Sequence, residues 1–198
     1  PGANFVPTAN THAYDSGEEG TLATCRYLDA AGIVHAGSGR HLREARAPAY
    51  LDTKRGRIAL IAVTATMPGP SVAGAQRPDT PGRAGIKPLR HSLSYVVDER
   101  GLEELRRLGA RLGFNAAVER RKNLGDSRQR LGGQSEQEYS FGAMRFEKGD
   151  RFGVRTTANK RDVEENLQQI KEARRMSDWV VVSRSEEHTS ELQSLAYL

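Results

Sequence analysis

A polar stretch near the start of the chain combines an amide, a hydroxyl, an imidazole and a carboxylate. Asn10, Thr11, His12 and Asp15 occur within residues 9–20, which read Ala-Asn-Thr-His-Ala-Tyr-Asp-Ser-Gly-Glu-Glu-Gly. The stretch follows a short strand-like run and precedes a helical pattern. In α/β proteins, ligands and metals bind where a strand ends and the chain turns toward the next helix. We therefore interpret these residues as a candidate site loop.

Two of these side chains have a structural interpretation beside the functional one. His12 is either a site residue or a loop histidine satisfied by a backbone carbonyl. Asp15 either orients the His12 ring or accepts hydrogen bonds from the backbone amides that begin at Gly17. The loop alone does not decide between these alternatives, so the surrounding elements matter.

The first half of the chain predicts a helix that opens at Gly20 and Thr21, with Thr21 as N-cap and Gly32 as its end. The segment 58–65 is apolar on both faces and is the strongest strand, of the type that lies in the middle of a covered sheet. The other expected elements are strands at 33–36 and 50–52, a helical turn at 40–46, and a long Pro/Gly-rich loop at 67–89.

The second half continues the alternation of strands and helices, which favours an α/β domain. We expect strands at 91–97, 139–147, 152–156 and 179–182, the last of a buried type, and a weak helix and loop over 115–138. An amphipathic helix over 101–112 should point Leu102, Leu105, Leu108 and Leu112 inward. A second helix, from an N-cap at Asn159 to 176, should bury Val163, Leu167 and Ile170.

Composition excludes several classes of function. The net charge is +5, but the arginines alternate with acidic residues and aromatic residues are sparse, which disfavours nucleic-acid binding. No apolar run is long enough to span a membrane. The single cysteine, Cys25, lies at helical spacing between two leucines and is interpreted as a small buried hydrophobe. His35, His41 and His91 stand alone, without partners at ligand spacing.

Several segments in order along the chain resemble the bacterial CapA family of poly-γ-glutamate capsule synthesis proteins. They include 9–12, 28–33, 44–48, 56–61, 82–90, 162–166, 170–175 and 178–183. The resemblance covers essentially all of 1–182, which we interpret as a partial CapA-like domain. The tail 183–198 resembles a translated sequencing adapter and is interpreted as non-native.

The resemblance implies an incomplete layered α/β sandwich of the metallo-dependent phosphoesterase type. It also implies divalent metal ions in the intact protein, with Asn10, Thr11 and His12 as ligands. His12 is the implied catalytic residue, and Asp15 is the neighbour that would orient it. The implied substrate is phosphorylated or polyglutamate-type, handled by phosphoester or acyl-phosphate chemistry at the bacterial cell envelope. The family's other site segments lie outside 1–182, so this chain is expected to be an internal fragment that binds no metal and has no activity by itself.

The resemblance also leaves an alternative open. The family loop reads Ala-Asn-Asn-His, and here Thr11 replaces the Asn next to the histidine. A hydroxyl is a poorer metal ligand, so the chain is interpreted either as part of a metal-dependent phosphoesterase-like protein or as a non-catalytic relative that serves binding or assembly. Metal content would separate the two.

Overall fold

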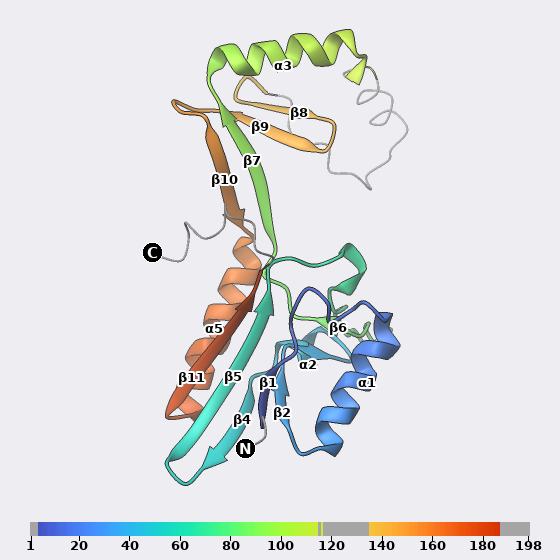
Figure 1. Cartoon of the computed structure of the whole chain (residues 1–198), viewed down its shortest axis with the longest axis vertical. Helices are drawn as coiled ribbons and strands as arrows, with labels where there is room; N and C mark the ends of the chain where they lie inside the picture. Colours follow the sequence, from blue (N-terminus) through green and yellow to red (C-terminus); the bar gives the residue numbers. More distant parts are fainter. Residues whose placement is uncertain (1–3, 115, 117–134, 187–198) are drawn as a thin grey trace. The chain divides into compact units, whose positions relative to one another are not determined.

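The computed structural model describes residues 4–114, 116 and 135–186, and these divide into two compact units. Unit 1 holds the described residues up to His91 and those from Ala158 onward, and unit 2 holds those between Ser92 and Thr157 (Figure 1). The expected domain over 1–182 thus contains two compact units, while its boundary at 182 stays a prediction.

A three-stranded sheet in the order β11-β5-β4 forms the centre of unit 1. The middle strand, β5 (Gly56–Thr64), pairs antiparallel with β4 (Ala49–Thr53) and parallel with β11 (Trp179–Ser185). Residues 59–64 are all buried, as expected for a strand covered on both faces. A tight turn at residues 54–55 joins β4 and β5.

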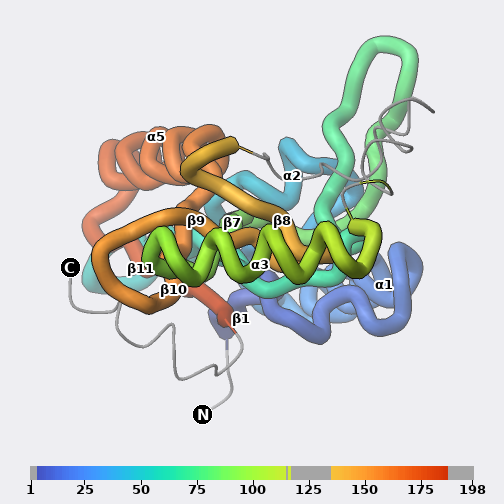
Figure 2. Tube along the Cα trace, turned by 90° about the horizontal axis from the view of Figure 1, so that it is seen from above, coloured from blue at the N-terminus to red at the C-terminus, as the bar shows by residue number. Residues whose placement is uncertain are grey.

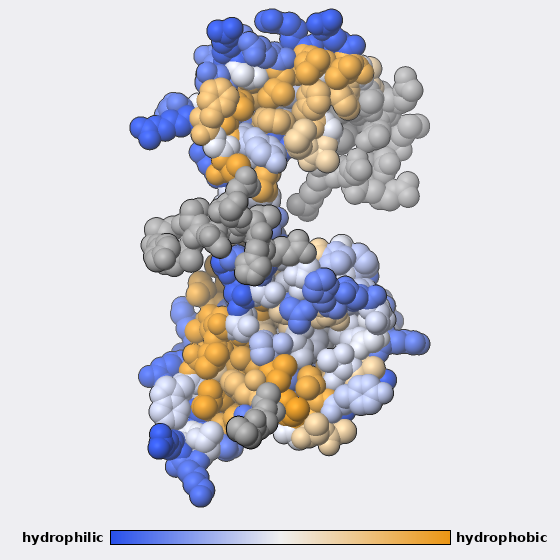
Figure 3. Space-filling view, in the orientation of Figure 1, coloured by the Kyte–Doolittle hydropathy of each residue, from blue (hydrophilic) through white to orange (hydrophobic). Residues whose placement is uncertain are grey.

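The last strand is more exposed than its apolar sequence predicts. Trp179, Val181 and Val182 are 50%, 46% and 47% exposed, so the expectation of a buried strand is wrong. The reason is position, because β11 pairs with β5 on one side and lies at the edge of the described sheet. Apolar side chains of β11 consequently lie at the surface, within an apolar area of unit 1 in the space-filling view (Figure 3). The strand also continues through Ser185, three residues past the expected domain end at 182.

A second, parallel pair of strands lies beside this sheet and leads into the first helix. β1 (Phe5–Pro7) pairs with β2 (Val34–Ala36), and α1 (Gly17–Ala30) connects them. The helix begins at Gly17 with Ser16 as N-cap, so the prediction of a Thr21 cap is wrong. Thr21 is instead buried in the helix, where its Oγ1 donates to the carbonyls of Ala13 and Gly17 at 2.8 and 3.0 Å. The helix ends as predicted, since Gly32 adopts a φ of 67° directly after it.

The region predicted as a long loop is largely organised by β-bridges. It contains the 3-10 helix η1 (Gly69–Ser71) and the short strand β6 (Gly85–Ile86), which pairs antiparallel with β3 (Ser38–Gly39). Isolated bridges join residues 72, 74 and 77 to residues 86, 83 and 80, so the chain folds back on itself, as the green loop of Figure 2 shows. The helical turn predicted at 40–46 is α2 (Leu42–Arg46).

Helix α5 (Lys160–Met176) packs against the three-stranded sheet. Asn159 caps it as predicted, because its Oδ1 accepts from the amide of Asp162 at 3.1 Å. Ala173 is fully buried in one cluster with Ile61 and Val63 of β5, and Ile170 packs against that cluster. Leu167 is 50% exposed, so its predicted place in the buried stripe is wrong.

Unit 2 is a four-stranded sheet with one described helix. The sheet order is β10-β7-β9-β8, and β7 (His91–Val97) begins in unit 1 and runs into unit 2. The other elements are α3 (Glu99–Arg111), β8 (Glu138–Phe141), β9 (Met144–Lys148) and β10 (Gly153–Ala158). Leu102, Val97 and Tyr139 form its buried core.

Two expectations about unit 2 are wrong, and one lies outside the described residues. The predicted single strand 139–147 is a hairpin that turns at Gly142, where φ is 61°. β9 and β10 do not pair with each other because β7 lies between them. Leu108 and Leu112 are 46% and 62% exposed rather than inward. The weak helix expected over 115–138 falls mostly on residues that the structure does not describe. The described fold is nevertheless mixed α/β, as predicted, and none of its helices is long and apolar enough to cross a membrane.

Candidate functional site

The candidate loop begins at the carboxyl end of β1, where the sequence placed it. Thr8 and Ala9 are buried directly before the loop. Thr8 fastens this point to the neighbouring strand, because its amide and its Oγ1 both donate to the carbonyl of Ala36, at 2.8 and 2.9 Å. Gly37 leaves room for the chain, since a Cβ at that position would lie 2.7 Å from the Cβ of Ala9. The start of the loop is therefore held firmly by the core.

Consecutive turns carry the loop into α1. The amide of Ala13 donates to the carbonyl of Asn10 at 3.2 Å, and the amide of Asp15 donates to the carbonyl of His12 at 3.2 Å. Thr21 then ties the loop to the helix through its bond to the carbonyl of Ala13. These bonds fix the backbone on both sides of His12 while its side chain points to solvent.

The His12 ring is oriented by a carboxylate. Its Nδ1 lies 2.9 Å from Oδ2 of Asp15, and the two side chains are 83% and 61% exposed. The structure thus has the first of the two arrangements considered for Asp15, an interaction with the imidazole. Because Nδ1 faces Asp15, Nε2 is the ring atom that remains open to a metal or a substrate. Among the described residues, Nε2 has no hydrogen-bond partner.

The expected metal ligands, Asn10, Thr11 and His12, are consecutive residues of this loop, and their role as ligands stays a prediction. Oδ1 of Asn10 accepts from the amide of His12 at 3.0 Å, which uses one of its lone pairs inside the loop. No group of three or more His, Cys, Asp or Glu side chains that could hold a metal ion occurs in the part of the chain that the structure describes. The loop offers one imidazole nitrogen, the amide of Asn10, the hydroxyl of Thr11 and the carboxylate of Asp15.

A polar pair that the sequence did not indicate lies near the amino end of β2. His35, expected to stand alone, has its Nε2 3.1 Å from Oδ1 of Asp29, near the end of α1. The nearby thiol of Cys25 is half-buried, and its Sγ lies 3.3 Å from Oγ of Ser38. Burial raises the pKa of this thiol, so it is protonated at neutral pH and a poor nucleophile. The expectation of a buried Cys25 is therefore met only in part, because the side chain is half-buried and contacts a hydroxyl.

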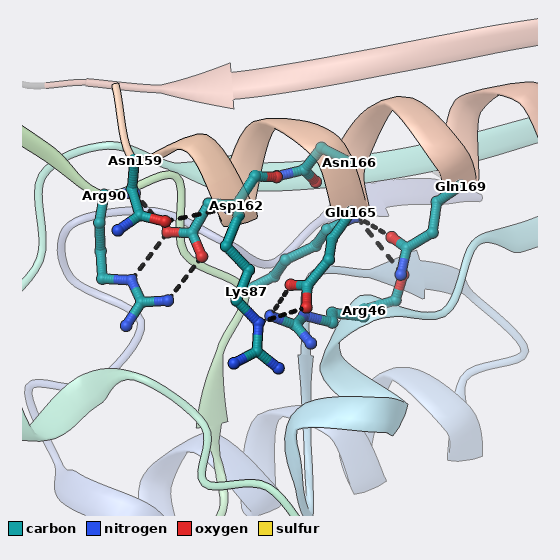
Figure 4. A network of polar contacts seen from close by, with 9 residues as sticks. Arg46, Lys87, Arg90, Asn159, Asp162, Glu165, Asn166 and Gln169 are labelled. Atoms are coloured by element: carbon teal, nitrogen blue, oxygen red, sulfur yellow. Dashed lines mark hydrogen bonds and ion pairs between the residues drawn. The ribbon is translucent and has the colours of Figure 1, made fainter. Parts of the chain in front are cut away.

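A second polar network joins α2, the segment after β6, and α5 (Figure 4). Lys87 is 2% exposed, and its Nζ donates to Oε1 of Gln169 at 2.5 Å and to the carbonyl of Arg46 at 3.4 Å. Burial, with a smaller contribution from the Arg46 charge, lowers the pKa of Lys87 to about 8. The Arg46 guanidinium in turn pairs with the Glu165 carboxylate.

Arg90 and Asp162 form the other half of this network. The Asp162 side chain is 0% exposed, and its two oxygens accept from Nε and NH2 of Arg90 at 2.7 and 2.6 Å. Burial alone would raise the pKa of Asp162, but the hydrogen bonds from Arg90 outweigh it and hold the pKa below its ordinary value. The sequence showed only ordinary helix and loop residues here, because the partners are up to 82 positions apart.

The family model described as "Bacterial capsule synthesis protein PGA_cap" matches residues 1–186. Two curated proteins of Sinorhizobium fredii (strain NBRC 101917 / NGR234), named "Uncharacterized protein y4sH" and "Uncharacterized protein y4uA", are each 31% identical over 180 residues. The match covers 91% of this chain and 36% of each relative, so the chain spans about a third of their length. The match over nearly the whole chain shows that it belongs to the bacterial capsule synthesis protein family PGA_cap, the CapA family.

Proposed function

We propose that this chain is part of a metal-dependent, phosphoesterase-like protein of the capsule synthesis family, with a layered α/β sandwich as its complete fold. In this proposal, His12 faces the reacting centre. The substrate is phosphorylated or polyglutamate-type, and the reaction is a phosphoester or acyl-phosphate conversion during capsule synthesis. A divalent metal would supply charge neutralisation and an activated water at such a centre.

One observation carries the proposal, namely the orientation of the His12 ring by Asp15. A carboxylate on Nδ1 favours one tautomer and one ring orientation, which is the arrangement found behind metal-bound histidines. We propose that the remaining ligands come from further parts of the longer protein, because the chain spans about a third of the length of its relatives.

Metal analysis tests this proposal. In a protein extended to the length of the relatives, we expect bound divalent metal and phosphoesterase activity, with both reduced by His12→Ala. The matched control is His91→Ala, which removes another exposed histidine and should change neither. The chain 1–198 alone should show no robust phosphatase turnover. A metal-free extended protein whose activity is unaffected by His12→Ala would overturn the enzymatic proposal.

A specific observation favours the alternative of a non-catalytic relative. Thr11 stands beside His12 where the family loop has an amide, and the amide oxygen of Asn10 is engaged by the His12 backbone. If these features mark a lost metal site, the extended protein would fold without metal and act in binding or assembly. If the metal site is lost, the Thr11→Asn variant should bind metal more tightly than the natural protein. If the site works with Thr11, the natural protein should already bind metal.

A further inference from the structure

A basic pocket in unit 1 lies away from the His12 loop. It has a volume of about 560 Å³, within the range of small-molecule sites. Three segments far apart in the sequence form its walls: α2, the turn at 75–78 and α5. Its lining residues are Leu42, Arg43, Arg46, Ala75, Gln76, Arg77, Pro78 and Gln169. None of them belongs to the loop 10–15.

The charge of the lining is entirely positive. Three arginines line the pocket and no carboxylate does. Arg46 is neutralised by Glu165, which lies behind it on α5. Arg43 and Arg77 are exposed, and neither forms an ion pair with another of the described residues. Two uncompensated guanidinium groups therefore face the same pocket.

The two arginines are carried by backbone whose position is fixed. The amide of Leu42 donates to the carbonyl of Gly74 at 2.9 Å, which joins the start of α2 to the segment that leads into the turn. Within the turn, Arg77 and Thr80 exchange two backbone hydrogen bonds of 3.0 and 3.1 Å. Both walls are thus connected, so a ligand would meet two positive groups with little rearrangement of the backbone.

The third wall adds a polar donor. Gln169 lines the pocket while its Oε1 accepts from the buried Nζ of Lys87 at 2.5 Å. An ammonium group can only donate, so the amide oxygen must face Lys87 and the amide nitrogen is left to donate elsewhere. The pocket therefore combines guanidinium and amide donors, and its lining side chains carry no acceptor with a negative charge.

We propose that this pocket binds a small ligand that carries at least two negative charges on phosphate or carboxylate oxygens. The planar guanidinium fork matches both kinds of oxyanion in a bidentate geometry, which is why two arginines with no counter-charge favour such ligands. The proposal goes beyond the function proposed for the His12 loop and does not depend on metal.

Calorimetric titration of the 198-residue chain at about 0.15 M salt tests this, because nonspecific surface attraction is screened under those conditions. Pyrophosphate and the tricarboxylate tricarballylate serve as probes, and the one that binds more tightly identifies the type of oxyanion. Arg43→Ala and Arg77→Ala should each weaken binding about tenfold, the loss expected for one charge-assisted hydrogen bond. Arg55→Ala is the matched control, since Arg55 is an exposed arginine of unit 1 outside the pocket.

His12→Ala should leave the affinity of the pocket for both probes unchanged. This result separates the proposed pocket from the function proposed for the His12 loop. Both pocket residues are exposed, so their variants should fold normally, and circular dichroism checks this. Binding of neither probe overturns the proposal. So does binding that Arg55→Ala weakens as much as Arg43→Ala, because that result indicates general surface charge.

Discussion

Lys87 should make the stability of unit 1 rise with pH, against the ordinary behaviour of a lysine. Its side chain is 2% exposed, and its Nζ has an amide oxygen and a carbonyl as hydrogen-bond partners instead of a carboxylate. Desolvation therefore disfavours the charged form in the folded state. The perturbation is a change of pH, compared between the natural chain and Lys87→Met, which keeps a long side chain but cannot titrate.

The magnitude follows from the pKa. A fall from the ordinary 10.5 to about 8 means that the charged amine costs about 3 kcal/mol in the folded state. Below the folded pKa this cost is present in full. Between the two values the unfolded chain binds the proton and the folded chain does not, so stability increases as pH rises. From about pH 7 to about pH 9.5, Lys87 should contribute a gain of about 2 kcal/mol in the free energy of unfolding.

Urea unfolding followed by tryptophan fluorescence measures this gain. The single tryptophan, Trp179, lies in β11 of unit 1, so the signal reports on the unit that contains Lys87. Other groups also titrate in this range, and the Cys25 thiol, whose pKa burial raises, acts in the opposite direction. The difference between the two proteins removes these shared contributions. The reasoning is refuted if the free-energy difference between the natural chain and Lys87→Met is the same at both pH values.

Three further substitutions test other parts of unit 1 by the same unfolding assay. Asp162→Ala removes a fully buried carboxylate with three hydrogen bonds from Arg90 and should cost about 2–3 kcal/mol, whereas Lys171→Ala on the exposed face of α5 should have little effect. Because the pKa of Asp162 is lowered in the folded state, its contribution to stability should be present above pH 3.8, the ordinary pKa, and be lost as the pH falls below that value. A stability difference between the natural chain and Asp162→Ala that does not change in acid would contradict the ion pair. Gly37→Ala places a Cβ 2.7 Å from Ala9 and 2.9 Å from Ala62 at a φ of 109°, and should cost about 1–3 kcal/mol, while Gly69→Ala, with nothing within 4 Å, should be tolerated. Equal stability of these two glycine variants would show that the start of the site loop is not tightly packed. Thr21→Val removes the bond to the carbonyl of Ala13 and should lower the free energy of unfolding by about 1 kcal/mol. Thr24→Val should cost less, because the Thr24 hydroxyl bonds only within the helix. The reverse order would exclude Thr21 as an anchor of the loop.

Much of the fold was readable from local patterns. The continuous apolar run of β5, the Asn159 cap of α5 and the glycine after α1 each express a rule that acts over a few neighbouring residues. The errors fall where distant partners decide. Thr21 is not the cap of α1 but a buried residue within it, bonded to the carbonyl of Ala13. The apolar residues of β11 are exposed because the strand lies at the edge of the described sheet.

The candidate site divides in the same way. The sequence by itself determined the family, the mixed α/β class and the position of a polar loop after the first strand, because these depend on residue types and their order. Only the tertiary structure decided that the side chains of His12 and Asp15 meet, that Lys87 is buried without a carboxylate as hydrogen-bond partner, and that Arg43 and Arg77 line one pocket. The physical reason is that burial and electrostatic pairing depend on which segments the fold brings together, and spacing along the chain does not specify them.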